Sequence, residues 1–301
     1  MTILIEQSGI RNKLIKKKVL VLGSTGLIGH QIHNHLQDTG KYNLFNITYR
    51  KKLQNDTFVI DARNERFFFN KIKSISPDII INAIGILIGG AKKDPENAIF
   101  LNAYLPHKLR NFSDSINAKL IHISTDCVFS GEKKDPYKED DLKDGQGVYA
   151  QTKGIGEIIC KNHLTLRTSV VGHELKENGE ELFHWFMSQS KPIEGFTKSV
   201  WSGVTTIELA KAVEASIQKN ITGLHHVTNN LTINKYELLM LIKKYTRKKI
   251  MITKVDGRKT DKSFIDTRRM LGYEIPSYDQ MIFEMVECIK KDQILYSQYS
   301  V

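Results

Sequence analysis

The stretch Lys18-Val19-Leu20-Val21-Leu22-Gly23-Ser24-Thr25-Gly26-Leu27-Ile28-Gly29 decides the fold of this chain. Its apolar run predicts a buried parallel strand, and the apolar residues that follow recur at helical spacing. Gly23 allows a sharp turn, Gly26 leaves room for a pyrophosphate against the backbone, and Gly29 lets the new helix pack closely on the strand. The free N–H groups of that helix then face the anion. The stretch therefore predicts the first strand-turn-helix unit of a dinucleotide-binding domain.

The composition is that of a globular protein. The 301 residues are 41% hydrophobic and 26% charged, which suits one large α/β domain or a nucleotide domain with a smaller companion. No apolar run approaches the roughly 20 residues that span a bilayer. Residues 1–16 form a basic extension without the features of a signal peptide. The three cysteines, Cys127, Cys160 and Cys288, lack the spacing of metal ligands, so we expect no metal site. That they are scattered along the chain favours a reducing cytoplasm.

The formal net charge of +11 raises the question of a polyanionic partner. The basic residues occur in scattered clusters, such as Lys16-Lys17-Lys18 and Arg247-Lys248-Lys249, without a nucleic-acid-binding motif beside them. An anionic small substrate and a phosphorylated cofactor account for part of the excess. We therefore expect neither a nucleic-acid polymer nor a membrane as a partner.

Strands and helices alternate along the first half of the chain. Further strands are predicted over residues 44–50, 57–61, 78–85 and 119–131. Helices are expected over residues 99–109 and from residue 149 onward. This alternation predicts a parallel sheet with right-handed crossovers. In the first helix, His30, His33 and His35 fall on more than one face, so we expect them at the surface.

The end of the second predicted strand bears on the choice of nicotinamide cofactor. An acidic residue there favours NAD, because its carboxylate binds the ribose 2′-hydroxyl. This chain carries Arg50 and Lys51 instead. A guanidinium pairs with a phosphate through two charge-assisted hydrogen bonds. The sequence therefore predicts NADPH as the preferred cofactor, with NADH as the alternative.

Tyr149 and Lys153 form the candidate catalytic pair. They are four residues apart, so they share one face of a helix. A free phenol has a pKa of about 10, and a neighbouring ammonium lowers it toward the range that general acid–base chemistry needs. Thr125 ends the fifth predicted strand, at the edge where open α/β sheets bind ligands. The tyrosine–lysine spacing alone is also common on surface helices, and the strand-end Ser124-Thr125-Asp126 is what favours catalysis.

The glycine spacing G-x-x-G-x-x-G resembles that of the extended short-chain dehydrogenases/reductases. Further segments narrow the resemblance to the dTDP-4-dehydrorhamnose reductase branch, from about residue 17 to residue 290: Ile123-Ser124-Thr125-Asp126-Cys127-Val128-Phe129-Ser130-Gly131, Tyr149-Ala150-Gln151-Thr152-Lys153, Leu166-Arg167-Thr168-Ser169, Gly203-Val204-Thr205-Thr206 and Gly223-Leu224-His225-His226. This resemblance implies a doubly wound, Rossmann-type α/β domain at residues 17–165. It also implies a smaller sugar-nucleotide-binding α/β domain at residues 166–301, with the segments of the two domains interleaved.

The resemblance also implies the binding residues. Cofactor contacts are expected from the glycine turn, the strand ends and the catalytic pair: Gly23, Ser24, Thr25, Gly26, Leu27, Ile28, Gly29, Arg50, Lys51, Asp61, Ala62, Asn82, Ala83, Ile84, Gly85, Asn102, Ile123, Tyr149 and Lys153. Substrate contacts are expected from Thr125, Asp126, Val128, Tyr149, Arg167, Lys198 and Trp201. Among these, Lys198 is a candidate for the charges of a nucleotide diphosphate and Trp201 for its base or sugar.

The implied activity is NAD(P)H-dependent reduction of the C4 ketone of a nucleotide-activated 4-keto-6-deoxy sugar for surface polysaccharide synthesis. In this scheme Tyr149 protonates the oxygen, Lys153 holds the nicotinamide ribose and Thr125 positions the carbonyl. Both dTDP-4-dehydro-L-rhamnose and a UDP-2-acetamido-2,6-dideoxy-L-hexos-4-ulose fit, because residues 170–173 depart from the usual pattern near the sugar. Two alternatives stay open: an epimerase or dehydratase of the same superfamily, and a non-catalytic subunit resembling the regulatory subunit of methionine adenosyltransferase. The oligomeric state is also open, with a homodimer as one form.

Overall fold

A seven-stranded parallel sheet forms the centre of the larger lobe. The computed structural model describes residues 16–301, so the predicted basic extension lies outside the described residues except for Lys16. The strand order is β11-β6-β5-β4-β1-β2-β3, and all neighbours run parallel. The strands are β1 (Lys18–Leu22), β2 (Asn43–Thr48), β3 (Phe58–Val59), β4 (Ile79–Asn82), β5 (Lys119–Thr125), β6 (Leu164–Thr168) and β11 (Gly223–His226). The order reverses between β1 and β4, which is where a doubly wound sheet opens a ligand crevice.

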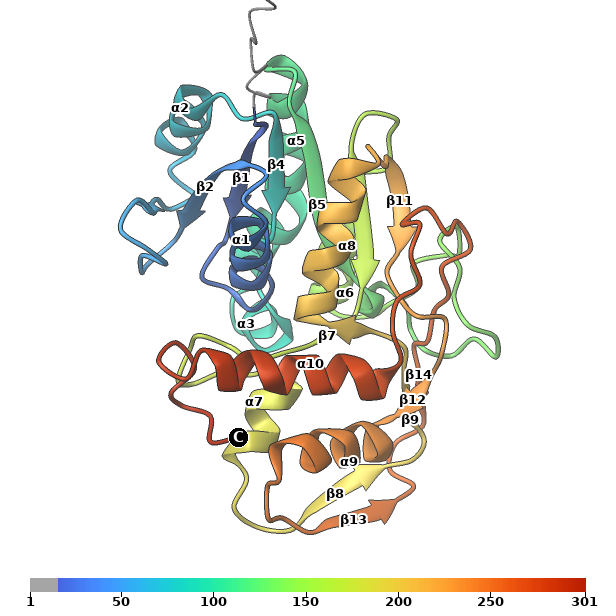
Figure 1. Ribbon diagram of the computed structural model, residues 1–301. Helices are drawn as coiled ribbons and strands as arrows, with labels where there is room; N and C mark the ends of the chain where they lie inside the picture. Colours follow the sequence, from blue (N-terminus) through green and yellow to red (C-terminus); the bar gives the residue numbers. More distant parts are fainter. Residues whose placement is uncertain (1–15) are drawn as a thin grey trace, which may run out of the picture.

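Helices cover both faces of this sheet (Figure 1). Successive residues of β1 point to opposite sides, so Val19 and Val21 join one core cluster while Leu20 and Leu22 join another. The first cluster lies under α1 (Leu27–Thr39) and α8 (Thr206–Gln218), which pack against each other. The second lies under α2 (Glu65–Ile75) and α5 (Leu105–Ser115). The predicted Rossmann-type fold class is therefore confirmed.

The smaller lobe consists of separate segments of the chain, between which the chain returns to the large lobe. Its elements are β7 (Val170–Val171), α7 (Leu182–Ser188), β8 (Ile193–Phe196), β9 (Ser199–Trp201), β10 (Val204–Thr205), β12 (Ile233–Asn234), α9 (Lys235–Thr246), β13 (Ile252–Val255), β14 (Thr260–Asp261) and α10 (Tyr278–Lys291). Between β10 and β12 the chain returns to the large lobe to form α8 and β11. The segments are thus interleaved, and the expected boundary at residues 165/166 falls inside β6. None of the helices in residues 16–301 is long and apolar enough to cross a bilayer.

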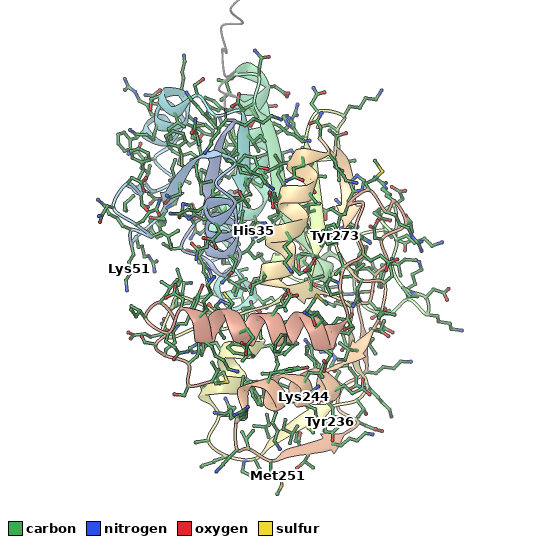
Figure 2. The ribbon with its side chains drawn as sticks, in the orientation of Figure 1. His35, Lys51, Tyr236, Lys244, Met251 and Tyr273 are labelled. Carbon is green, nitrogen blue, oxygen red and sulfur yellow. The ribbon has the colours of Figure 1, made fainter. Side chains whose placement is uncertain are left out.

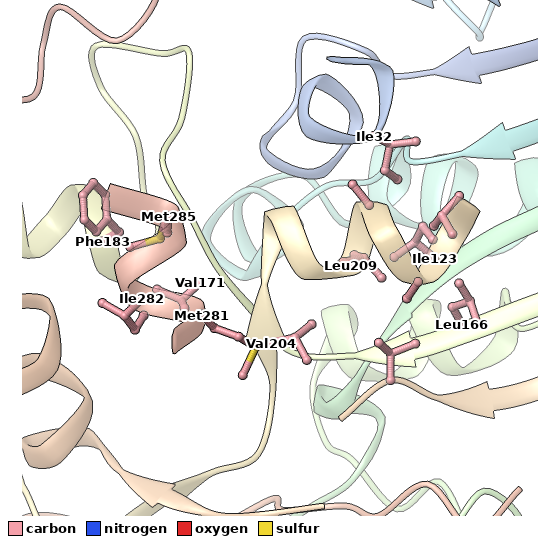
Figure 3. Packing of buried hydrophobic residues seen from close by; sticks show 14 of the residues in the cluster. Ile32, Ile123, Leu166, Val171, Phe183, Val204, Leu209, Met281, Ile282 and Met285 are labelled. Atoms are coloured by element: carbon pink, nitrogen blue, oxygen red, sulfur yellow. The ribbon is translucent and has the colours of Figure 1, made fainter. Parts of the chain in front are cut away.

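One hydrophobic core runs through both lobes. Leu209 and Ile123 belong to the large lobe, and Phe183, Met281 and Met285 to the small one, yet all are members of the same buried cluster (Figure 3). On α7, the side chains of Phe183 and Phe186 are fully buried in this core, whereas Trp185 is 40% exposed. The shared core holds the two lobes in a fixed relation.

The helical region before β5 is more irregular than the sequence pattern predicts. It consists of α3 (Ile88–Lys93), α4 (Pro95–Ala98), a π-helical segment η1 (Ile99–Tyr104) and α5. Asn102 lies in η1, and such π turns often occur at functional sites. Beyond β5 follow a short 3₁₀ turn, η2 (Asp126–Val128), and α6 (Val148–Ile155).

The prediction of three surface histidines on α1 is wrong for two of them. His30 and His33 have no exposed surface. The Nδ1 atom of His30 lies 2.8 Å from the carbonyl oxygen of Gly26, and its ring packs near that of Tyr296 in the C-terminal segment. His35 is partly buried and pairs with Glu214 on α8 at 2.8 Å. Because α1 is buried on several sides, histidines on more than one of its faces can all lie inside the protein.

Candidate functional site

The glycine turn between β1 and α1 has the geometry that the sequence predicts. Gly23 has φ +80°, and a Cβ atom there would lie 3.0 Å from the carbonyl oxygen of Ala83. A Cβ atom at Gly29 would lie 2.2 Å from the carbonyl oxygen of Gly23, so only glycine permits this close packing. Gly26 precedes α1, and no side chain caps that helix. The turn therefore offers bare backbone and uncapped N–H groups, which suit the pyrophosphate of a dinucleotide.

Three predicted cofactor residues use their side chains to brace the site. Ser24 is fully buried and donates to Asn46 Oδ1 at 3.0 Å. The side-chain amide of Asn82 contacts His122 Nδ1 at 3.1 Å. Asn102 is fully buried as well, accepting from the Ile86 N–H at 2.9 Å and lying 3.1 Å from its carbonyl oxygen. The three side chains thus brace the edge of the sheet at which the cofactor contacts are predicted.

The remaining residues predicted to contact the cofactor lie along the same edge of the sheet, where the strands end. The structure places them in the turn, at the start of α1, or directly after β3 and β4: Thr25, Leu27, Ile28, Ala62, Ala83, Ile84 and Gly85. Ile123 lies on β5 and is almost fully buried. Apart from Ala62, which follows the edge strand β3, these positions lie on or next to the strands β1, β4 and β5 beside the switch point.

A basic cluster follows β2. The ring of Tyr49 lies 4.8 Å from the guanidinium of Arg50 and 5.5 Å from that of Arg63. Arg63 also forms a salt bridge with Asp61 at 2.7 Å and donates to the Tyr49 hydroxyl. The Asp61 carboxylate, which the resemblance implies as a cofactor contact, is therefore paired with an arginine that the sequence analysis did not identify. Lys51 is exposed and points away from the protein (Figure 2).

Thr125, Tyr149 and Lys153 meet at the carboxyl edge of β5. Thr125 is the last residue of that strand, while Tyr149 and Lys153 lie on α6. A hydrogen bond with Thr125 lowers the pKa of Tyr149 against the larger effect of burial. Lys153 is nearly fully buried and donates from Nζ to the carbonyl oxygen of Ile123 at 2.7 Å. The structure thus brings the three predicted catalytic residues together.

The electrostatics of this trio differ from the expectation for Tyr149. Burial raises the pKa of its phenol above the ordinary value, and the charges of Cys127, Asp126 and Glu181 act in the same direction. Burial also lowers the pKa of Lys153 to about 8, which the charge of Glu157 partly opposes. The ammonium is directed to a main-chain carbonyl, so the expected lowering of the Tyr149 pKa by Lys153 is not what these residues produce.

Several charged residues act on Asp126, and most of them belong to no motif that predicts the site. Burial raises the pKa of Asp126, while the charges of Lys262 and Lys235 lower it. Glu181 stands directly before α7, and burial together with Glu174 raises its pKa to about 7. Lys235 opens α9 and Glu181 precedes a different helix, so only the folded chain brings their charges near that of Asp126.

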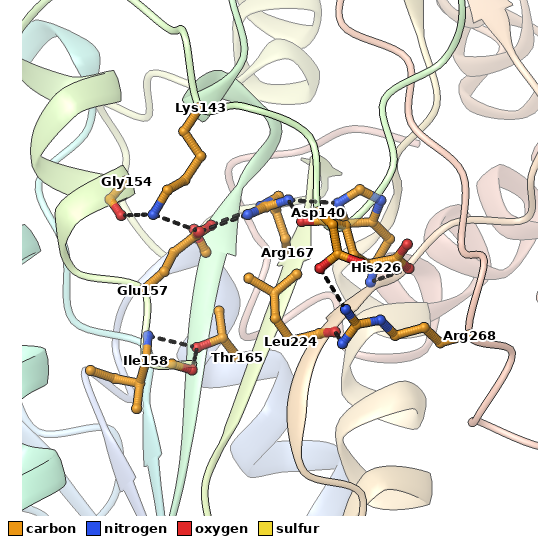
Figure 4. Close-up of polar contacts among 12 residues, drawn as sticks. Asp140, Lys143, Gly154, Glu157, Ile158, Thr165, Arg167, Leu224, His226 and Arg268 are labelled. Atoms are coloured by element: carbon orange, nitrogen blue, oxygen red, sulfur yellow. Dashed lines mark hydrogen bonds and ion pairs between the residues drawn. The ribbon is translucent and has the colours of Figure 1, made fainter. Parts of the chain in front are cut away.

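Arg167, predicted to bind substrate, lies instead in a buried ion pair. Its guanidinium is 1% exposed and donates to both carboxylate oxygens of Glu157, at 2.8 and 2.7 Å (Figure 4). Ser124 and Lys143 contact the same carboxylate. The pair therefore braces β6 against the segment that directly follows α6, and the expectation for Arg167 is corrected.

The other predicted substrate contacts are Lys198, Trp201 and Val128, and the three lie in different surroundings. Lys198 is 54% exposed and pairs with Asp256 at 2.5 Å on the surface. Trp201 is 5% exposed and packs against Tyr278, so it belongs to the core. Val128 is buried in a small apolar cluster next to the site. Within residues 16–301 no group of His, Cys, Asp and Glu has metal-binding geometry.

Known proteins resemble this chain in sequence and in fold. The family described as "RmlD substrate binding domain" matches residues 17–270. The chain is 29% identical to the spore coat polysaccharide biosynthesis protein SpsK of Bacillus subtilis over 230 residues, which are 75% of this chain and 78% of SpsK. It is 27% identical to dTDP-4-dehydrorhamnose reductase of Escherichia coli over 241 residues, 76% and 78% of the two chains. The crystal structure of dTDP-4-dehydrorhamnose reductase from Bacillus anthracis in complex with NADP has a similar fold. It matches with a TM-score of 0.77 and 22% identity, over 90% of this chain and 98% of that one.

Proposed function

Because the chain belongs to the RmlD substrate-binding domain family, we propose that it reduces the C4 ketone of a nucleotide-activated 4-keto-6-deoxy sugar with NADPH. The observation that carries the proposal is the meeting of Thr125, Tyr149 and Lys153 at the sheet edge that also holds the uncapped glycine turn. A proton donor and a dinucleotide cradle at one edge are the parts that a ketone reduction needs.

The roles of the residues follow from their positions. A reduced nicotinamide held at this edge supplies the hydride that C4 of the sugar receives. Tyr149 gives its phenolic proton to the ketone oxygen, and the ketone becomes a hydroxyl group. Thr125 holds the same oxygen through its hydroxyl, which is already hydrogen-bonded to Tyr149. Lys153, whose Nζ donates to the carbonyl oxygen of Ile123, is the residue that would hold the nicotinamide ribose.

The raised pKa of Tyr149 suits the direction of this reaction. A phenol with a pKa above its ordinary value is fully protonated near neutrality, so it is ready to act as the acid. Proton loss then creates a buried phenolate, and the hydrogen bond with Thr125, which lowers the pKa of Tyr149, is the contact that stabilises it. Reduction therefore uses the protonation state that the site favours.

NADPH, and not NADH, is the cofactor that the basic cluster after β2 favours. Arg50 and Arg63 both lie against Tyr49, and Lys51 adds a third exposed cation. In contrast, the acid near this point, Asp61, is bound to Arg63. A 2′-phosphate next to such a cluster gains charge-assisted hydrogen bonds that a 2′-hydroxyl does not.

The substrate that we propose first is dTDP-4-dehydro-L-rhamnose, with a UDP-2-acetamido-2,6-dideoxy-L-hexos-4-ulose as the alternative. The relatives named dTDP-4-dehydrorhamnose reductase support the first, and SpsK supports a place in polysaccharide biosynthesis. The free thiols Cys127, Cys160 and Cys288 support a cytoplasmic reaction. The test is to follow NADPH oxidation by the purified chain with each ketone and to identify the reduced sugar. If the chain binds NADPH and both sugar nucleotides but oxidises no NADPH, the proposal is wrong and a non-catalytic subunit is favoured.

A further inference from the structure

The buried histidines of α1 lie where apolar residues would suffice to fill the core. His30 and His33 lie on consecutive turns of the helix, and neither has exposed surface. Burial lowers the pKa of His30 to about 4, so its ring is neutral and one of its two nitrogens carries a proton. A buried polar ring is costly to the fold unless its nitrogens are hydrogen-bonded. The contacts of these two rings therefore show what the histidines do.

His30 binds a main-chain carbonyl of the glycine turn. Its Nδ1 atom lies 2.8 Å from the carbonyl oxygen of Gly26. The main-chain N–H of His30 donates to the same oxygen at 3.2 Å, which is the ordinary helical bond. The carbonyl is thus held by two groups of one residue, whereas a leucine at this position would supply only the second.

Gln31 fixes the proton of His30 on Nδ1. The amide nitrogen of Gln31 lies 2.9 Å from His30 Nε2, and because an amide nitrogen only donates, Nε2 is the acceptor. The opposite tautomer would turn a lone pair of Nδ1 toward the Gly26 oxygen. Gln31 is itself oriented from the C-terminal segment, because its amide also donates to the Tyr296 hydroxyl at 2.9 Å.

The direction of the Gly26 carbonyl determines the direction of the next N–H group. The Gly26 carbonyl and the Leu27 N–H belong to one planar peptide group and point in opposite directions. Leu27 is the first residue of α1, and within residues 16–301 no side chain caps this helix. Its N–H is therefore among the donors that a helix leaves free at its start. With the carbonyl held toward His30, this N–H points out of the helix start, where the pyrophosphate binds in the proposed function.

His33 reaches the same turn by a second route. Its Nε2 atom lies 3.3 Å from the amide nitrogen of Asn46 on β2. The Oδ1 atom of Asn46 accepts a hydrogen bond from the Ser24 hydroxyl at 3.0 Å. Ser24 directly follows Gly23 in the turn. The contacts of both buried histidines thus lead to the glycine turn, which core packing alone does not require.

We propose that His30, with its proton held on Nδ1 by Gln31, is a positioning residue for the dinucleotide: it fixes the peptide group whose Leu27 N–H donates to the pyrophosphate. His30 touches no ligand and acts through the main chain. A donor that is already aimed loses no freedom when the anion binds, so the gain appears in cofactor affinity. The proposal rests on the proposed function for the dinucleotide, and it needs neither the sugar nor turnover.

The test moves the side-chain donor of residue 30 and measures NADP⁺ binding by calorimetry. His30→Asn keeps an N–H near the place of Nδ1, His30→Gln moves it to the place of Nε2, and His30→Leu removes it. The Kd of NADP⁺ should rise about three- to tenfold in His30→Gln and His30→Leu, as the loss of one hydrogen bond implies. His30→Asn should bind NADP⁺ as the unchanged protein does. Thermal unfolding of each variant records the effect on stability separately.

His163→Leu is the matched control. His163 is 1% exposed, and its Nδ1 atom accepts a hydrogen bond from the Leu120 N–H at 3.0 Å. It directly precedes β6, which runs parallel to β5, so it lies at the edge of the sheet opposite to the strand ends that form the site. This variant should lose stability and leave the Kd of NADP⁺ unchanged.

A second measurement reads the tautomer in the unchanged protein. Nitrogen NMR spectra of protein with labelled histidines should show His30 protonated on Nδ1 and not on Nε2. This measurement needs no variant, so it decides the question even where His30→Leu fails to fold. A proton on Nε2 would overturn the proposal.

The binding data can overturn it in two further ways. An unchanged Kd in both His30→Gln and His30→Leu would show that the bond to Gly26 does not position the turn. A Kd that rises with lost stability in every variant, the control included, would make the role of His30 purely structural. If the unchanged protein binds neither NADP⁺ nor NAD⁺, the proposed function has failed in its cofactor, and this proposal fails with it.

Discussion

Lys153 donates a hydrogen bond from Nζ to the main-chain carbonyl oxygen of Ile123, 2.7 Å away. The bond joins α6 to β5, two residues before that strand ends at Thr125. The register between helix and strand is therefore fixed at the point where Tyr149 and Thr125 have to meet. A lysine that is already oriented loses little further freedom when it binds a ribose.

Replacing Tyr149 with phenylalanine should stop turnover and leave the fold intact. The change removes one hydroxyl group and keeps the ring that packs at the site. General acid catalysis commonly contributes a factor of about 10² to 10⁴, so kcat should fall within that range. Thermal unfolding and NADP⁺ titration should give the values of the unchanged protein. A variant that kept more than about a tenth of kcat would show that Tyr149 is not the acid.

Replacing Arg50 with aspartate should shift the cofactor preference toward NADH. The new carboxylate repels a 2′-phosphate and can accept a hydrogen bond from a 2′-hydroxyl. We expect the ratio of kcat/KM for NADPH over NADH to fall at least about tenfold. Arg258→Asp makes the same charge change in the exposed part of the small lobe and serves as the control. Equal kcat/KM values for the two cofactors in the unchanged protein would refute the argument.

The strand-turn-helix unit was predictable because its signal is local. The conformation of Gly23 and the close packing of Gly29 depend on residues within one turn of each other. Thr125, Tyr149 and Lys153 were found in the same way, from a strand end and a helical spacing. Lys235 and Glu181 carry no such signal, since each begins or precedes a helix far from Tyr149 in sequence.

Arg167 shows why residue type alone misleads. An arginine in the substrate half of the chain was predicted to bind a ligand, but its partner is Glu157, ten residues earlier. Nothing local in the sequence tells whether a guanidinium faces a ligand or a buried carboxylate. The same limit applies to Trp201, whose ring the fold places against Tyr278 and not in an open site.

Replacing Arg167 with glutamine should therefore reduce stability and not substrate affinity. The change removes the guanidinium that donates to both oxygens of the buried Glu157 carboxylate. Breaking such a buried pair lowers the free energy of unfolding by about 3 to 5 kcal/mol. Urea denaturation should show a loss in that range, while the KM of the sugar nucleotide changes little. Lys244→Gln, which breaks an exposed pair with Asp279, should cost less than about 1 kcal/mol. A raised KM with unchanged stability would return Arg167 to the substrate site.

Two buried histidines should make the fold sensitive to acid. Burial lowers the pKa of His30 to about 4 and that of His173 to about 3, from about 6.5 in an unfolded chain. The two rings lie near each other, and Gln31 Nε2 contacts a nitrogen of each. Below pH 6.5 the unfolded chain binds protons that the folded chain excludes, so the free energy of unfolding falls as the pH falls toward 4. Each histidine contributes a slope of about 1.4 kcal/mol per pH unit in that window.

The variant His173→Phe isolates one of these contributions. The ring centroids of His173 and Tyr296 are 4.2 Å apart, and phenylalanine keeps a ring at this place. The change also removes Nδ1, which has no hydrogen-bond partner within residues 16–301. Gln31 keeps the Tyr296 hydroxyl as an acceptor at 2.9 Å. Urea denaturation between pH 5 and pH 6 should give a slope about 1.4 kcal/mol per pH unit shallower in the variant than in the unchanged protein. Because carboxylates with raised pKa values act in the opposite direction in both proteins, only this difference is diagnostic. Equal slopes would mean that His173 takes up its proton without loss of the fold.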